Sequence, residues 1–436
     1  MSSIPSTFPP PSAVSLKDRL YARITVRLMP VLMLAFIAAQ IDRVNVGFAK
    51  AQMQSALDFS DAVYGLGAGI FFIGYFLFEV PSNAILARVG ARRWLARIVI
   101  TWGIMSAMTA FVQTPGQFYV VRFLIGVAEA GFAPGVIYYL STWFPNSRRG
   151  RATSYVGISI PLAFILGAPI SGWILHSFAG STIMAPWRWL FVLEALPALV
   201  AGILLLIFLN DDIKSAKWLS EEDKSMVEED LRIDNREKVA GIPLTEMFRL
   251  PAVWMLSFIY FCLLMGLYGL NFWMPSLIMR SGVSNELTVG LLTAIPFTAA
   301  LIAILVTGRT ADRTRMRRAH FSGAMFMGAA ALAGAMAIGG GPVATVLALS
   351  VAAAGLLSAT ILIWAFPTAM MQGATAAIGI AIVNSLGNLA GFVSPFAVGW
   401  LNVRTGNPEL GMYLITVVVT IGAIAALTLP ARVVDK

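Results

Sequence analysis

Charged residues are scarce in this chain of 436 residues. Asp, Glu, Lys and Arg make up 12% of it, whereas 58% is hydrophobic. A soluble protein carries about 25% charged residues. None of these four residue types occurs between His320 and Arg404, and water-soluble folds do not tolerate uncharged apolar runs of that length. With a mean hydropathy of +0.79, the composition excludes a soluble globular enzyme and indicates a polytopic membrane protein.

Residue types on which much catalytic chemistry depends are also missing. The chain has one cysteine, Cys262, and two histidines, His176 and His320. Neither a disulfide framework nor a Cys- or His-based metal site is therefore expected. The sequence has no Gly-Lys dipeptide, which excludes a P-loop and gives no reason to expect nucleotide binding. No nucleophile–base set is recognisable, so an enzyme is not expected.

Long apolar segments are what the sequence has in abundance. Windows of about 20 apolar residues predict membrane-spanning helices. The alternating ten-residue patterns of a membrane β-barrel are missing, so the predicted fold class is an all-α membrane protein. The twelve predicted spans are 27–49, 62–86, 94–112, 116–140, 152–176, 187–209, 252–280, 287–308, 319–338, 343–371, 374–402 and 409–430.

The basic residues are distributed unevenly about these spans. If both termini are cytoplasmic, 25 of the 31 Lys and Arg lie inside the cell and four outside, the four being Lys50, Arg188, Arg280 and Arg404. This bias predicts a multi-pass protein of the plasma (inner) membrane with both termini in the cytoplasm. It also accounts for the net charge of +9 without nucleic acid. Residues 1–26 hold no apolar core, so no cleavable signal peptide is expected.

A polar stretch divides the spans into two groups of six. The predicted parts are a tail (1–26), a first half (27–209), a linker (210–251), a second half (252–430) and a short tail (431–436). The linker holds half of all the acids, and Ser220 with Asp223 predicts a helix N-terminus there, with a solvated helix through about Glu237. Parallel six-helix repeats are typical of one large transporter fold.

Short Arg-rich loops follow the second and eighth spans, Arg88-Val-Gly-Ala-Arg92-Arg93 and Gly308-Arg-Thr-Ala-Asp312-Arg313. These loops resemble the loop motif of the major facilitator superfamily, although the first copy has Asn83 and Ala87 at the motif's Gly and Asp positions. The resemblance implies a cytoplasmic gate. Its candidate residues are Glu79, Arg92, Arg93, Asp312 and Arg313, with Glu79 as a helix-end partner for the arginines.

Several longer segments resemble the anion:cation symporter family within that superfamily. They are Gln40-Ile-Asp42-Arg43-Val-Asn45-Val-Gly47, Phe78-Glu79-Val-Pro81-Ser-Asn83, Arg122-Phe-Leu-Ile-Gly126-Val-Ala-Glu129-Ala-Gly131, Trp187-Arg188-Trp189 and Asn384-Ser-Leu-Gly387-Asn388. The family includes tartrate, phthalate, hexuronate and galactonate permeases and the vesicular glutamate transporters, and the match is strongest to the bacterial tartrate-transporter-like branch. The resemblance implies uptake of a small organic anion with protons as coupling ion and no other cofactor, by a monomer in the lipid bilayer.

A charge inside a membrane span costs a few kcal/mol, so each one needs a reason. Six occur, all in the first half: Asp42, Arg43, Glu79, Arg122, Glu129 and Glu194. At 1.5 Å per residue, Asp42 and Glu129 lie about 22 and 20 Å from the cytoplasmic ends of their spans, and Arg122 lies about 30 Å away. Since the superfamily resemblance implies that spans 1 and 4 line the central cavity, these side chains are expected to converge.

Such a set suits symport of protons with an anion. We predict that Asp42 or Glu129 is the proton site and that Arg122 or Arg43 clamps the anion, because protonating a neighbouring acid frees the planar guanidinium for a carboxylate. A buried ion pair that only joins spans 1 and 4 is the alternative. Glu194 is expected to form a structural pair near Arg188.

Neutral side chains complete the predicted substrate site. Tyr75 is expected to reach the substrate or Arg122, and Asn271 follows Tyr268-Gly269, where a broken helix is plausible. Asn384 and Asn388 share a helix face, and either interhelical hydrogen bonds or substrate contacts would satisfy them.

Other functions remain open at this stage. A proton-coupled antiporter or exporter of the same fold is the main alternative, and a membrane receptor that does not transport is another. Use of both Arg43 and Arg122 would favour a hydroxy-dicarboxylate such as tartrate over a sugar acid or an aromatic carboxylate.

Overall fold

A computed structural model describes residues 16–236, 247–337, 340–371, 373–407 and 409–435. Residues 1–15 of the predicted N-terminal tail, residues 237–246 of the predicted linker and Lys436 of the C-terminal tail lie outside the described residues.

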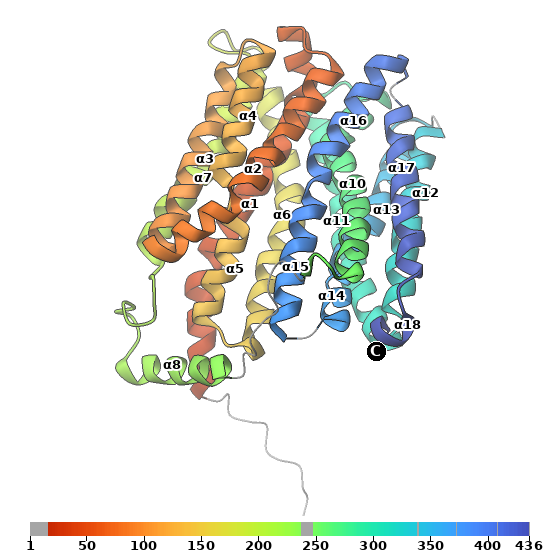
Figure 1. The fold of residues 1–436 in the computed structure, drawn as a ribbon. Helices are drawn as coiled ribbons and strands as arrows, with labels where there is room; N and C mark the ends of the chain where they lie inside the picture. The colour runs from red at the N-terminus through yellow and green to blue at the C-terminus, as the bar shows by residue number, and fades with distance from the viewer. Residues whose placement is uncertain (1–15, 237–246, 338–339, 372, 408, 436) are drawn as a thin grey trace, which may run out of the picture.

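The described residues form helices and no strands (Figure 1). The helices are α1 (Leu16–Leu57), α2 (Asp61–Val89), α3 (Ala91–Met108), η1 (Thr109–Phe111), α4 (Pro115–Glu129), α5 (Phe132–Trp143), α6 (Asn146–Ser177), α7 (Pro186–Phe208), α8 (Glu221–Arg236), α10 (Pro251–Arg280), α11 (Glu286–Thr314), α12 (Arg317–Ala337), α13 (Gly341–Leu362), α14 (Ala365–Met370), α15 (Gly373–Asn388), α16 (Ala390–Thr405), α17 (Leu410–Leu427) and α18 (Ala431–Val434).

Twelve helical segments of the described chain are long and apolar enough to cross a membrane, which confirms the predicted number. Three of them are interrupted, between α4 and α5, between α13 and α14, and between α15 and α16. At the first interruption Gly131 has φ +84°, a left-handed conformation that favours glycine. Glu129 is the last residue of α4, and Asn388 is the last residue of α15. The break expected near Asn271 was wrong, because α10 runs unbroken through it.

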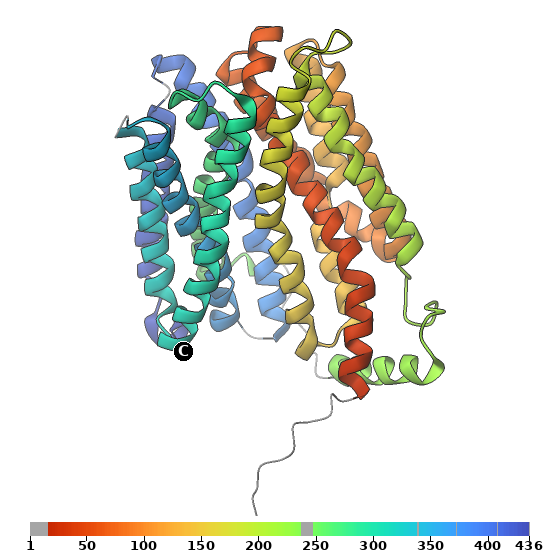
Figure 2. The ribbon, with the colours of Figure 1, turned by 180° about the vertical axis from the view of Figure 1, so that it is seen from behind.

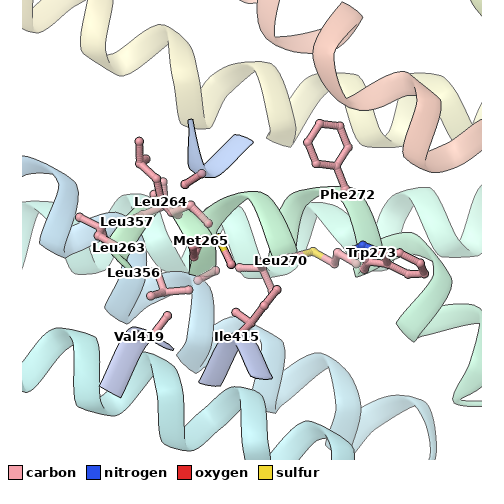
Figure 3. Packing of buried hydrophobic residues seen from close by; sticks show 14 of the residues in the cluster. Leu263, Leu264, Met265, Leu270, Phe272, Trp273, Leu356, Leu357, Ile415 and Val419 are labelled. Atoms are coloured by element: carbon pink, nitrogen blue, oxygen red, sulfur yellow. The ribbon is translucent and has the colours of Figure 1, made fainter. Parts of the chain in front are cut away.

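The two groups of six spans form two helix bundles that lie side by side (Figures 1 and 2). In the second bundle, α10 packs leucines and methionines such as Leu263 and Met265 against Leu356 of α13 and Val419 of α17 (Figure 3). The bundles meet mainly where α6 lies along α11 and α2 lies along α16, with α10 against α1. A small cavity lies at the contact between α1 and α10.

The linker helix α8 lies across one end of the first bundle, which we call the linker end (Figure 1). The predicted capping box is present, because the Asp223 amide donates to Ser220 Oγ over 3.1 Å. The acids of α8 hold it to the bundle: Lys17 Nζ lies 2.6 Å from Asp230, and Arg23 lies 3.0 Å from Asp223. Helix α8 is therefore held against the first bundle. The C-terminal α18 lies at the same end of the molecule.

Candidate functional site

Asp42 and Arg43 are neighbours on α1, and successive helical residues point about 100° apart. The structure places their side chains in different surroundings. Arg43 lines a small central cavity, whereas Asp42 is 1% exposed and bonds to α3. α1 therefore separates two polar regions of the first bundle.

Arg43 forms an ion pair with Glu129 of α4. Its Nη2 and Nε lie 2.5 and 2.8 Å from the same carboxylate oxygen, Oε1. The Glu129 side chain is 1% exposed and that of Arg43 is 20% exposed. The guanidinium carbon also lies 5.3 Å from the centre of the Tyr75 ring and 5.5 Å from that of Phe71. Removing one partner of such a buried pair leaves an uncompensated charge and is costly.

The central cavity lies between α1, α6 and α10. Its volume is about 50 Å³, and its lining residues are Gln40, Arg43, Val44, Phe164, Tyr268, Asn271 and Phe272. A water molecule needs roughly 30 Å³, and pockets for small organic ligands measure roughly 300–1,000 Å³. In this conformation the site therefore holds Arg43 against Glu129 and has no room for an organic anion.

The second bundle contributes neutral polar groups to this site. Asn271 lines the cavity directly. The Tyr268 hydroxyl donates to Asn388 Oδ1 over 2.9 Å, and Asn388 Nδ2 donates to Asn384 Oδ1 over 3.2 Å. The two amides are thus linked to the cavity by the side chain of Tyr268. The sequence did not identify Tyr268 as a substrate-site residue. Both the oxygen and the nitrogen of the Asn388 amide thus have hydrogen-bond partners, as polar groups in a helix bundle require.

Arg122 occupies a separate place on α4. It is 1% exposed, its Nε donates to the Gly67 carbonyl over 3.3 Å, and it lies 5.3 Å from the Phe71 ring centre. No described carboxylate lies within ion-pair distance of it, so of the two candidate arginines it is Arg43 that pairs with an acid. Glu129 lies two turns further along α4 than Arg122, where Arg43 of α1 reaches it. Tyr75 likewise lies against Arg43 and not against Arg122.

Asp42 accepts two hydrogen bonds from α3. Trp102 Nε1 donates over 3.0 Å and Ser106 Oγ over 2.8 Å. Glu194 of α7, expected to form a structural pair near Arg188, has a different partner. Arg188 donates to the carbonyl oxygens of Ala110 and Val112, and Glu194 contacts Ser171 of α6 at 2.5 Å.

The residues proposed for a gate lie at the linker end. The Arg92 backbone N–H donates to Asp211 over 2.8 Å, and Asp312 lies 3.5 Å from Arg317. Arg93 and Arg313 are exposed. Within the described chain no ion pair joins Glu79 to the arginine loop.

A buried charged cluster at the opposite end of the bundle was missed by the sequence analysis. Lys50, expected outside the membrane, lies where α1 continues past the predicted span to Leu57, and it is 3% exposed. Its Nζ lies 2.9 Å from Asp61 and 3.8 Å from the Trp273 ring centre. Asn402 also donates to Asp61 over 3.1 Å. We call Lys50, Asp61, Trp273 and Asn402 the far-end cluster.

The far-end cluster joins the two bundles. Lys50 and Asp61 belong to the first bundle, and Trp273 and Asn402 belong to the second. Near them the Tyr64 hydroxyl donates to the Phe272 carbonyl over 2.9 Å, and a Cβ at Gly65 would collide with the Pro395 backbone. The bundles are therefore closed against each other at the far end.

Metal chemistry has no recognisable place in the described residues, since no group of three or more His, Cys, Asp or Glu side chains lies close enough to hold an ion.

Comparison with known proteins gives a consistent assignment. The sequence model of the Major Facilitator Superfamily matches residues 32–395. NicT of Pseudomonas putida, named provisionally as a metabolite transport protein, is 44% identical over 96% of both chains. A protein of Agrobacterium vitis, whose name assigns tartrate transport provisionally, is 43% identical over 95% of both chains. A quinolone resistance transporter of Acinetobacter baumannii is 39% identical over 92% of both chains.

Solved structures share the fold. The xylose transporter XylE of E. coli, in a partially occluded inward-open conformation, superposes with a TM-score of 0.73 at 13% identity. The match covers 93% of this chain and 99% of that one. At this identity the likeness establishes the architecture alone.

Proposed function

Since this chain belongs to the Major Facilitator Superfamily and is a membrane transporter, we propose that it imports a small organic anion together with protons by alternating access. The observation that carries the proposal is the ion pair between Arg43 and Glu129 at the central cavity. Relatives whose names include tartrate transport support an organic anion as the substrate class.

The pair provides a mechanism for coupling. While Glu129 is ionised, it occupies the guanidinium of Arg43 and its negative charge repels an anionic substrate. When Glu129 takes up a proton, the pair loses its Coulomb attraction, and the planar guanidinium becomes free to bind a carboxylate through two parallel hydrogen bonds. A proton and an anion therefore bind together, and neither binds well alone.

The neighbouring groups have supporting roles in this proposal. Tyr75 holds the arginine in place through its ring, and Asn271 and Tyr268 offer neutral hydrogen-bonding groups for substrate hydroxyls. Asn388 and Asn384 orient the Tyr268 hydroxyl. Arg122, buried with an unpartnered Nη2, would hold a second carboxylate once the cavity expands. That arrangement favours hydroxy-dicarboxylates over monoacids.

Alternating access requires the bundles to part at one end and close at the other. We propose that the linker end faces the cytoplasm of the inner membrane, because the Arg clusters lie there, and that the far-end cluster closes the external side in this state. Arg92, Arg93, Asp312, Arg313 and Glu79 would act at the cytoplasmic side. The working unit in the bilayer is a monomer.

A second candidate function is export by proton antiport. The relative named a quinolone resistance transporter favours it. The direction of substrate movement distinguishes symport from antiport. In symport, a pH gradient that drives protons inward also drives the substrate inward, whereas in antiport it drives the substrate outward.

Purified protein in proteoliposomes tests the proposal. With an inwardly directed proton gradient, uptake of labelled hydroxy-dicarboxylates, sugar acids or aromatic carboxylates should exceed uptake without the gradient. Abolition of uptake by a protonophore is the expected control. Failure of every acid in the panel, together with gradient-driven efflux of a quinolone, would replace symport by export.

A further inference from the structure

A second polar region lies behind α1, on the side away from the central cavity. It consists of Asp42 and Asn45 of α1, Ser106 of α3, Ser171 of α6 and Glu194 of α7, and we call these five residues the buried seam. Each is at most 2% exposed. Polar groups removed from water in this way need partners, and the partners differ along the seam.

Glu194 has no cationic partner among the described residues. Its Oε1 lies 2.5 Å from Ser171 Oγ, and its Oε2 has no hydrogen-bond partner. Arg188, on the same helix, is engaged by two backbone carbonyls. An ionised carboxylate with one neutral hydrogen bond would be costly here, whereas a protonated carboxyl group loses much less on burial.

The hydroxyl of Ser171 has a single hydrogen, and two acceptors lie within its reach, Glu194 Oε1 at 2.5 Å and the Gly167 carbonyl at 3.0 Å. It can donate to only one of them. With Glu194 protonated both contacts are satisfied, because Glu194 then donates to Ser171 while Ser171 donates to Gly167.

Asp42 has the opposite surroundings. It accepts hydrogen bonds from Trp102, whose indole N–H can only donate, and from Ser106. Two donors suit an ionised carboxylate. The seam therefore pairs one carboxyl group whose contacts suit a bound proton with one whose contacts suit a negative charge.

Asn45 connects the two acids. It lies one helical turn from Asp42 on α1, and α1 packs against both α6 and α7, the helices that carry Ser171 and Glu194. The amide is fully buried, yet neither its Nδ2 nor its Oδ1 has a hydrogen-bond partner. Unpartnered buried amides are rare and call for an explanation. An amide can accept from a protonated carboxyl group with one atom while donating to a carboxylate with the other.

We propose that Glu194 is a second proton-holding residue, which exchanges its proton with Asp42 along the buried seam. When Glu194 passes the proton to Asp42, Glu194 becomes a carboxylate and Asp42 becomes a carboxylic acid. Asp42 then releases the proton to water on one side of the membrane and Glu194 is protonated again from the other side, so each cycle carries one further proton across. Asp42 is the charged group that faces Glu194 from α1; α3 offers neutral donors, α6 offers Ser171, and η1 has no ionisable residue. The role rests on the proposed proton coupling and adds one proton to the cycle.

Infrared difference spectroscopy in lipid tests the protonated state without any transport. The wild-type protein at neutral pH should show the carbonyl-stretch band of a buried carboxylic acid, and Glu194→Gln should lose it. Glu222→Gln, which alters an exposed acid on α8, is the matched control and should keep it. Ser171→Ala should shift the band, because it removes the hydrogen-bond partner. A band unchanged in both Glu194→Gln and Ser171→Ala would overturn the assignment.

The proton-to-substrate ratio tests the role in coupling. It is obtained from the pH gradient at which net flux through the protein stops. In Glu194→Gln this ratio should fall by one relative to wild type, and in Glu222→Gln it should not change. An unchanged ratio in Glu194→Gln would overturn the coupling role. Absence of gradient-driven flux in wild type would instead refute the proposed function, while the infrared result would still decide whether Glu194 is protonated.

Discussion

The two bundles of this transporter divide the polar chemistry between them. The first bundle holds every ionisable group proposed for coupling: Arg43, Glu129, Arg122, Asp42 and Glu194. The second bundle presents neutral groups to the same cavity, namely Tyr268 and Asn271, with Asn384 and Asn388 behind them. Charges can take up and release protons, whereas amides and hydroxyls can only donate and accept hydrogen bonds.

The difference has an energetic basis. Each charge inside the membrane costs a few kcal/mol, and the first bundle offsets this cost with an ion pair for Arg43 and two hydrogen bonds for Asp42. The amides of the second bundle carry no charge, so their burial costs less. Mutations in the first bundle should therefore change coupling or abolish transport, and mutations in the second should change substrate affinity.

The largest effect is expected at Arg43. Arg43→Lys keeps the charge but removes the fork that binds a carboxylate through two hydrogen bonds. Charge-assisted hydrogen bonds contribute about 1.5–3 kcal/mol each, so kcat/KM for uptake should fall roughly 100-fold. Arg404→Lys, at an exposed arginine of α16, is the matched control. Equal uptake by both variants would mean that Arg43 does not bind the substrate.

A conformational effect is expected at the far-end cluster. Asp61→Asn removes the charge that holds Lys50 and should open the far end. Because the sequence has a single cysteine, Cys262, a Cys262→Ser background with Gln52→Cys and Glu286→Cys would report closure by cross-linking across the bundles.

In this background, Asp61→Asn should lower the cross-linking yield roughly tenfold, corresponding to about 1.4 kcal/mol. Glu221→Gln, which breaks an exposed pair on α8, provides the comparison. If Asp61→Asn left the yield at the level of Glu221→Gln, the far-end cluster would not stabilise the closed end.

A smaller effect is expected in the second bundle. Asn388→Ala removes the acceptor of the Tyr268 hydroxyl, and one neutral hydrogen bond is worth about 1 kcal/mol. KM should rise roughly fivefold while the proton-to-substrate ratio stays at the wild-type value. A changed ratio would break the division of labour between the bundles.

The smallest effect is expected at the linker helix. Asp230→Asn removes the ion pair with Lys17, whose side chain is 51% exposed. Exposed pairs contribute about 0–1 kcal/mol, so thermal unfolding should shift by a few degrees at most and uptake should stay unchanged. Loss of uptake would assign α8 a part in gating.

The sequence predicted much of this arrangement. Long apolar windows predict spans reliably, since a helix satisfies all of its own backbone hydrogen bonds in lipid. The capping box of Ser220 and Asp223 could also be predicted, because it depends only on residues three apart in the sequence. The pairing of Arg43 with Glu129 was left open, because helical spacing indicates which residues share a face but not which neighbour that face meets. The burial of Lys50 against Trp273 of the other bundle was not predicted, because hydropathy cannot detect a helix that continues past its apolar segment. The break after Glu129 depends on Gly131, one of 38 glycines.

The most direct test of the account is uptake by Glu129→Gln in proteoliposomes. Glutamine imitates the protonated acid, so Arg43 should remain free to bind substrate while proton binding at this position is lost. We predict that this variant retains substrate counterflow and loses the stimulation of uptake by an inwardly directed proton gradient. Full gradient-driven uptake in Glu129→Gln would contradict the central role of the Arg43–Glu129 pair in coupling.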